Sequence, residues 1–321
     1  MKGRLLRLGG TLAVTALAGA YILWKINVGK TVHIIRSADL GWLGLATFLM
    51  FITVAPMTWR WQKLLAVRGI HDSYEWLTRA YFVSYAVGQV LPTSVGGDAS
   101  RIYETARRHP GKLTPITGSV LLERSLGGAV TLVLAAVGFV LAIGRYNIGA
   151  YLWVEALFVI LTVIAGFVFF SHRVRSHLRF AVPLVRRVKL ERLARAIYEG
   201  IHGYRYHVGT LLAAVGATVI VQGGRIVAIW AAGEAVGIHL SIRPYVVLGP
   251  LLFLVMLVPF TINGLGVREA FFVSFLGKLH IGADPAAATG FLFFLLTLVL
   301  SLPGLAVILW EGVRRTPVPD V

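Results

Sequence analysis

Two proline- and glycine-rich segments interrupt apolar runs and place arginine where it could bind an anion. The first, LPTSVGGDASR, covers residues 91–101, and the second, VPFTINGLGVRE, covers residues 258–269. We expect a helix to begin in each segment, with Arg101 and Arg268 one to two turns inside it. A helix N-terminus carries partial positive charge and free N–H groups, which together with an arginine fork can bind a phosphate. The pattern therefore predicts an anion site at each segment.

Neighbouring residues complete these two predicted sites. Ser94 and Asn263 are predicted N-caps, because their side-chain oxygens can accept hydrogen bonds from the free N–H groups. Gly97 and Gly264 would let the backbone turn sharply or let a ligand approach it closely. Glu269 is assigned to the second site as well.

A purely structural role for the two arginines is the alternative. Asp98, Arg101 and Glu104 follow one another at i, i+3 spacing, which places them on one face of a helix. Each arginine would then tie its segment to an acidic neighbour.

Three further charged residues, Glu123, Arg124 and Arg225, lie within apolar stretches. A charge at the centre of a bilayer costs about 2.5 to 3.5 kcal/mol, so each one needs a reason. Arg124 could bind a phosphate while Glu123 holds neighbouring arginines in place, or the pair could snorkel to the membrane interface. Arg225 either faces a ligand or pairs with Glu234 or Glu123.

Motifs of catalytic and metal sites are absent from the sequence. The nine histidines lie near segment ends without His-Glu-x-x-His spacing, and there is no P-loop or dinucleotide glycine pattern. The chain has no cysteine, which excludes disulfides and a thiol nucleophile. We therefore expect no enzyme activity, no metal and no cofactor.

The composition is typical of an integral membrane protein. Of 321 residues, 57% are hydrophobic and 14% are charged, whereas soluble domains have about 25% charged residues. Apolar runs long enough to cross a bilayer lie at residues 8–24, 38–59, 117–143, 150–171, 208–234 and 286–311. Two other runs, 78–93 and 244–279, end or break at the proline- and glycine-rich segments.

The basic residues orient the chain in the membrane. Cytoplasmic loops carry an excess of Lys and Arg, and the connector 172–207 holds nine of them. With this connector and both termini in the cytoplasm, 78–93 becomes a re-entrant hairpin from the cytoplasm and 244–279 one from outside. We predict an all-α membrane bundle of about six full spans and two re-entrant hairpins. The net charge of +17 then follows from topology, and no nucleic-acid partner is expected.

The two segments also align with each other as an internal repeat. The alignment pairs Pro92 with Pro259, Ser94 with Thr261, Gly97 with Gly264 and Arg101 with Arg268. The surrounding repeats, residues 38–143 and 208–311, would cross the membrane in opposite directions. Inverted repeats with helices broken at mid-depth are the architecture of secondary transporters. We therefore expect residues 1–321 to form a single transmembrane domain.

Three stretches carry a resemblance to a known family: LPTSVGGDASRIY, SVLLERSLG and VPFTINGLGVREAFF. They resemble motifs of the lysylphosphatidylglycerol synthase transmembrane-region family, which includes the flippase half of the bacterial multiple peptide resistance factor and stand-alone relatives. The resemblance implies movement of an anionic or polar-headgroup lipid between leaflets of the cell (inner) membrane. The lipid would be a phospholipid, an aminoacyl-phosphatidylglycerol or a polyprenyl-phosphate-linked lipid. We expect the chain to depart from the best-known member in lacking an aminoacyl transferase domain.

Two other functions stay open at this point. A membrane-embedded transferase acting on a lipid carrier would need an acid or base, for which Glu104 and Glu123 are the candidates. A non-transporting subunit of an envelope-lipid synthase would bind lipid without moving it. The expected partners are accordingly a membrane lipid, a second copy of the chain and a separate lipid synthase.

The predicted orientation can be tested with single cysteines, because the chain has none of its own. Ala106→Cys should react with a membrane-impermeant thiol reagent only from the cytoplasmic side, and Gly277→Cys only from outside. Labelling of both positions from the same side would contradict the opposed hairpins.

Overall fold

A computed structural model describes most of the chain. It describes residues 20–90 apart from 22, 95–144, 203–257 apart from 205, 264 and 266–315, with isolated positions between 149 and 160. Within these residues the regular elements are α-helices. In chain order the principal ones are α2 (Val28–Arg36), α3 (Leu40–Ile52), α4 (Val54–Val67), α5 (Tyr74–Val90), α6 (Val95–Arg108), α7 (Leu113–Ala142), α12 (Val208–Ala235), α13 (Arg243–Leu257), α14 (Val267–Gly277) and α15 (Ala283–Arg315).

Four stretches of helix are long and apolar enough to cross a membrane. They are Leu40–Val67, which joins α3 and α4, Leu113–Ala142, Val208–Ala235 and Ala283–Glu311. The shortest of them has 28 residues and extends about 42 Å, which exceeds a hydrocarbon core of about 30 Å. The chain is thus a multi-pass membrane protein, and four of the six predicted spans coincide with these helices.

The other predicted spans stay predictions. Residues 8–24, 150–171 and the connector 172–207 lie outside the described part of the chain except for isolated positions. The re-entrant course of the two predicted hairpins is likewise untested.

The first span changes from α3 to α4 at Thr53 and continues well beyond its predicted end. Asp39 starts α3 by accepting hydrogen bonds from the N–H groups of Gly41 (2.7 Å) and Trp42 (3.1 Å). Pro56 lacks the N–H that would bond to the carbonyl four residues earlier, which accounts for the change of helix. The span ends at Val67 rather than at residue 59, so Arg60 lies inside it.

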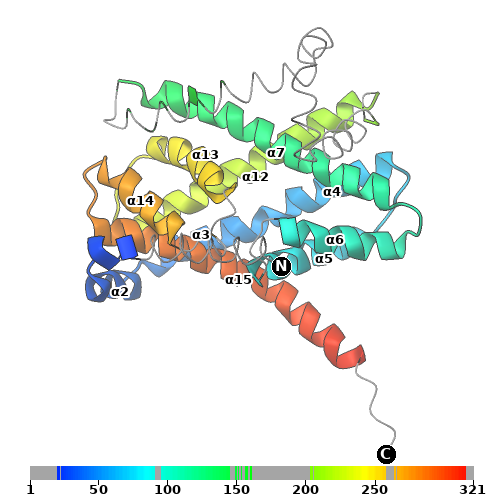
Figure 1. The fold of residues 1–321 in the computed structure, drawn as a ribbon, viewed down its shortest axis with the longest axis horizontal. Helices are drawn as coiled ribbons and strands as arrows, with labels where there is room; N and C mark the ends of the chain where they lie inside the picture. Colours follow the sequence, from blue (N-terminus) through cyan, green and yellow to red (C-terminus); the bar gives the residue numbers. More distant parts are fainter. Residues whose placement is uncertain are drawn as a thin grey trace, which may run out of the picture.

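The described helices form two sets with the same order. The first set is α3/α4, α5, α6 and α7, and the second is α12, α13, α14 and α15. Each set runs long, short, short, long. Figure 1 shows α5 and α6 side by side at the right and α13 and α14 at the left. The links between the short helices, 91–94 and 258–263, lie outside the described residues, and so do Ser94 and Asn263.

The two sets interlock through their short helices. The last helix of the second set, α15, packs along α5, and the last helix of the first set, α7, packs along α13. Both contacts use a glycine: a Cβ on Gly138 would lie 3.0 Å from the Val246 carbonyl oxygen, and one on Gly304 would overlap the Phe82 carbonyl. Because backbone meets backbone at both places, movement of α5 or α13 must involve the last helix of the other set.

Helix α12 lies between the two hydrophobic cores. Ala228, Ala231 and Ala232 pack into the core of the first set, whereas Ile226 and Ile229 pack into the core of the second. Outward-facing positions of the spans carry exposed large apolar side chains, as expected for contact with lipid tails.

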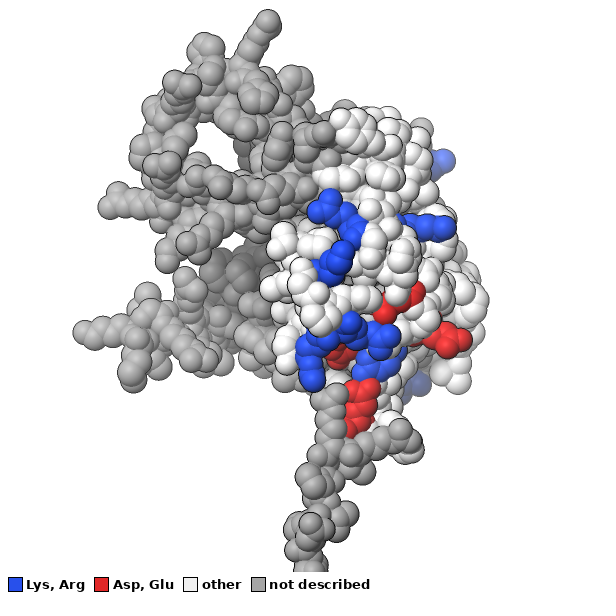
Figure 2. Space-filling model, turned by 90° about the vertical axis from the view of Figure 1, so that its right-hand side faces the viewer, with Lys and Arg blue, Asp and Glu red and all other residues white. Residues whose placement is uncertain are grey.

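Ion pairs tie the α5 and α6 end of the molecule together. Arg79 in α5 pairs with Glu104 in α6 (3.0 Å) and with Glu311 near the end of α15. Viewed from this side, basic and acidic side chains gather together on the surface (Figure 2).

The α5–α15 contact can be tested at its glycine. Gly304→Ala should lower the melting temperature of the detergent-purified protein, because overpacking of a tight contact typically costs about 1 to 3 kcal/mol. Gly128→Ala in α7 is the matched control, since a Cβ there meets nothing within 4 Å. Equal melting temperatures for both variants would contradict the close approach.

Candidate functional site

A buried carboxylate on α7 gathers charged groups from the rest of the first set. Glu123 Oε1 accepts a hydrogen bond from Arg60 Nε (2.9 Å), and Oε2 accepts one from Arg101 Nη1 (2.6 Å). The Tyr81 hydroxyl donates to the same carboxylate at 2.8 and 3.0 Å. The side chain of Glu123 is only 1% exposed. Glu123 therefore holds two arginines in place, and the snorkelling alternative is wrong for this residue because it lies about three turns inside α7.

Further contacts satisfy the two buried guanidinium groups. Arg60 Nη1 donates to Thr218 Oγ1 in α12 (2.7 Å). The Arg101 guanidinium lies over the rings of Trp61 and Tyr81, 4.6 and 4.7 Å from their centroids. Such cation–π contacts stabilise a desolvated cation. The residues in contact with one another here thus come from five helices, α4, α5, α6, α7 and α12.

Asp98 links this buried centre to a more exposed arginine. Arg101 Nε and Nη2 both contact Asp98 Oδ1, at 3.1 and 3.0 Å, and Arg124 pairs with Asp98 Oδ2. The predicted Asp98–Arg101 contact is confirmed, but Glu104 pairs with Arg79 instead of joining it. We call Arg60, Tyr81, Asp98, Arg101, Glu123 and Arg124 the ion cluster. It contains three guanidinium groups and two carboxylates.

Among the described residues, the second set of helices contains one buried ion pair in place of a cluster, formed by Arg268 and Glu269. Arg268 donates to Glu269 Oε1 through Nε (2.9 Å) and Nη2 (2.6 Å), and Glu269 Oε2 accepts the Gly266 N–H (2.7 Å). The Arg268 guanidinium also lies over the Phe294 ring, 4.8 Å from its centroid. Both side chains of the pair are buried.

Two expectations for this segment were wrong. The N-cap of α14 is Gly266 rather than Asn263, and Arg268 stands in the first turn rather than one to two turns inside. The helix starts later because Gly266 adopts a left-handed φ of 83° and the Glu269 side chain reaches back to its N–H.

The two predicted site glycines have different roles. Gly264 has a φ of 72°, which fits the predicted sharp turn. Gly97 instead lies in the first turn of α6, where a Cβ would overlap the Ser84 carbonyl of α5. Gly97 therefore permits close packing of α5 and α6. The prediction of a sharp turn at Gly97 was wrong, and α5 occupies the place predicted for a ligand.

Arg225 stands apart from both groups. It lies well inside α12, half-buried, and its Nη2 contacts the Tyr85 hydroxyl (3.1 Å) and the Met57 sulfur (3.8 Å). Both predicted acidic partners are engaged elsewhere, Glu234 with a histidine and Glu123 in the ion cluster. Among the residues that the structure describes, Arg225 has neutral partners only.

Sequence reasoning missed Arg60, Tyr81 and Thr218. The apolar run predicts a span that ends at residue 59, which places Arg60 just beyond its cytoplasmic end. A usable signal follows it: Trp61, Leu64 and Leu65 continue the apolar face at helical spacing. Tyr81 and Thr218 carry no such signal, because their partners come from other helices.

Comparison with known proteins agrees with this architecture. No curated protein matches the chain. A family model described as the lysylphosphatidylglycerol synthase TM region matches residues 9–304, which include all of α2 to α14 and most of α15. The chain therefore belongs to the lysylphosphatidylglycerol synthase transmembrane-region family.

Proposed function

We propose that the protein moves an anionic lipid between the two leaflets of the membrane. Its family ties it to lipid synthesis or transport. The observation that supports the proposal is Arg225, a half-buried cation in a spanning helix whose partners among the described residues are neutral. Such a charge is costly in a membrane, and a lipid phosphate would supply the missing anion through charge-assisted hydrogen bonds.

The ion cluster supports the same proposal in a different way. Its buried part, built on Glu123, is a scaffold that keeps Arg60 and Arg101 in place. Arg124 is the most exposed of its three guanidinium groups at 38%, so it is the one that an anionic headgroup would reach first. We expect the headgroup to arrive on the side of Arg124.

The interlocked helices suggest how the two sets would act together. We propose that the sets are inverted repeats whose short helices enter from opposite sides, with both termini in the cytoplasm. Close contacts of α15 with α5 and of α7 with α13 would couple movement at one hairpin to the other set.

We propose no enzyme activity for this chain. A catalytic acid or base must be within reach of its substrate, whereas both oxygens of the buried Glu123 carboxylate are already occupied by two guanidinium groups and the Tyr81 hydroxyl. Glu104, the other candidate, is paired with Arg79.

Arg225→Gln tests the proposal directly. Loss of a charged hydrogen-bond donor costs about 1.5 to 3 kcal/mol, so we expect translocation of a fluorescent anionic lipid in proteoliposomes to slow about 10- to 100-fold. Stability should change little, because the described partners of Arg225 are neutral. Arg243→Gln, at an exposed position at the start of α13, is the control. Unchanged translocation in the Arg225 variant would exclude this arginine from the transport path.

Glu123→Gln tests the scaffold role. Removing one partner of a buried ion pair typically costs about 3 to 5 kcal/mol, so the melting temperature should fall sharply. Glu104→Gln, which breaks a half-exposed pair, should cost about 1 kcal/mol or less. A Glu123 variant of normal stability with abolished turnover of a lipid carrier would favour the transferase instead.

A further inference from the structure

Two cavities, each lined in part by residues of α4, differ in chemistry, since the smaller one contains charged and polar side chains whereas the larger one does not. The larger one is an open groove of about 520 Å³ between α4 and α12, and its lining is almost entirely apolar. The walls include Ala55, Pro56 and Trp59 from α4 and Ala213, Gly216 and Ile220 from α12.

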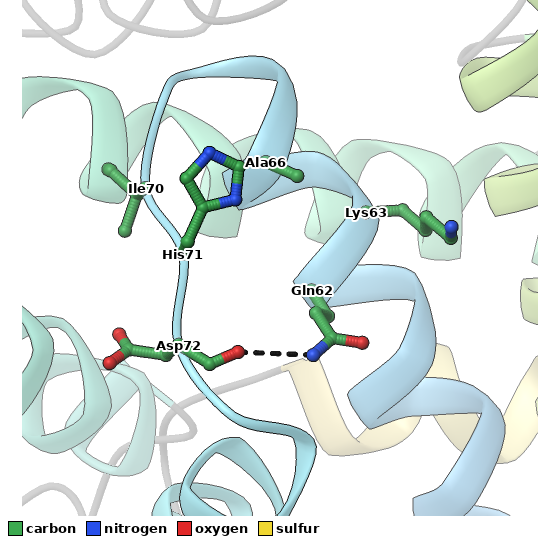
Figure 3. A pocket seen from close by; sticks show the side chains of 6 residues that line it. All are labelled: Gln62, Lys63, Ala66, Ile70, His71 and Asp72. Atoms are coloured by element: carbon green, nitrogen blue, oxygen red, sulfur yellow. Dashed lines mark hydrogen bonds between the residues drawn. The ribbon is translucent and has the colours of Figure 1, made fainter.

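The second cavity, of about 180 Å³, lies between the end of α4 and the loop that leads to α5 (Figure 3). It is lined by Gln62, Lys63, Ala66, Ile70, His71 and Asp72. The Asp72 carboxylate points away and contacts Arg108 (3.1 Å) and His109 (2.8 Å). The Asp72 carbonyl accepts a hydrogen bond from Gln62 Nε2 (3.1 Å). The cavity therefore offers an amide and an imidazole, with its carboxylate already paired, and Lys63 extends from its rim away from His71 and Asp72 (Figure 3).

The two cavities share one face of α4. Residues 55, 59, 62 and 66 follow one another at spacings of four, three and four, which is the repeat of a single helix face. Lys63 connects the cavities, because its ammonium lies 5.9 Å from the centroid of the Trp59 ring. Tryptophan and lysine are the residues that mark the boundary between hydrocarbon and headgroups. The apolar groove therefore lies where the acyl chain of a lipid would be, and the smaller cavity lies where its headgroup would be.

We propose that these cavities bind one anionic phospholipid of the surrounding bilayer. An acyl chain fills the groove between α4 and α12, and the phosphate lies at Lys63 and Gln62. This site is separate from the ion cluster, because Arg60 and Thr218 join α4 and α12 on another face of the same two helices. Binding here does not depend on transport.

Binding of an acyl chain in the groove can be tested by filling the groove with a larger side chain. A Cβ on Gly216 meets nothing within 4 Å, so Gly216→Leu should occupy the groove without disturbing the fold. We expect native mass spectrometry of the detergent-purified protein, after addition of phosphatidylglycerol, to show one bound lipid fewer than in the unmodified protein. Gly209→Leu, at a similarly open position of α12, should keep that lipid. Equal retention by the Gly216 variant, or equal loss in both variants, would overturn the proposal.

Binding of the phosphate at Lys63 can be tested by removing the charge of this lysine. Lys63→Gln should lower the preference for phosphatidylglycerol over phosphatidylcholine about fivefold, since a lysine near a membrane surface contributes about 1 kcal/mol of attraction to anionic lipid. Lys112→Gln, at an exposed position on the loop before α7, is the control and should leave the preference unchanged. An unchanged preference in the Lys63 variant would refute the phosphate assignment. Arg225→Gln should retain this lipid, so failure here and failure of the transport proposal are separate outcomes.

Discussion

Burial of the Glu123 carboxylate is the constraint on which the packing of the first set depends. A buried carboxylate must be matched by cations and donors, since an unpaired charge in a low-dielectric interior is very costly. Arg60, Arg101 and Tyr81 supply them from three different helices. Satisfying this one group therefore determines how α4, α5 and α6 lie against α7, and the bond from Arg60 to Thr218 extends the same constraint to α12.

The second set buries its arginine by a different arrangement. The stretch of α15 that corresponds to Glu123 is apolar, and its Gly290 lets α14 approach closely: a Cβ there would lie 3.2 Å from Glu269 Cα. The carboxylate for Arg268 comes from the next residue of the same helix. Movement of α6 relative to α4 or α7 would break buried ion pairs, whereas α14 can move with its own pair intact. The two sets therefore share an order of helices but differ in what holds them.

Helices α4 and α12 present different chemistry on different faces. The buried face of α4 carries Arg60 and Trp61, while another face carries the small residues and Trp59 that line the groove. This division follows from helical geometry, because residues three or four apart share a face and adjacent residues do not. One pair of helices can in this way serve an ion cluster and a lipid-facing groove at the same time.

Local sequence patterns were sufficient to predict the membrane class, four of the spans, the family and the turn at Gly264. Each of these depends on composition, run length or the conformational freedom of one residue, all of which are present in the sequence itself. The Asp98–Arg101 contact was predictable for the same reason, since both residues belong to one helix at fixed spacing.

The remaining features were decided by which helix faces meet. Arg60 lies 63 residues from Glu123 and 158 from Thr218, and no periodicity along the chain relates positions so far apart. Likewise an acidic partner was one of the two alternatives for Arg225, but in the folded chain Met57 of α4 and Tyr85 of α5 lie beside it. The sequence alone determined that Glu123 and Arg225 lie within membrane helices. Only the tertiary structure decided which charges neutralise one another, because the pairing of charges on different helices depends on the rotation and depth at which the helices pack.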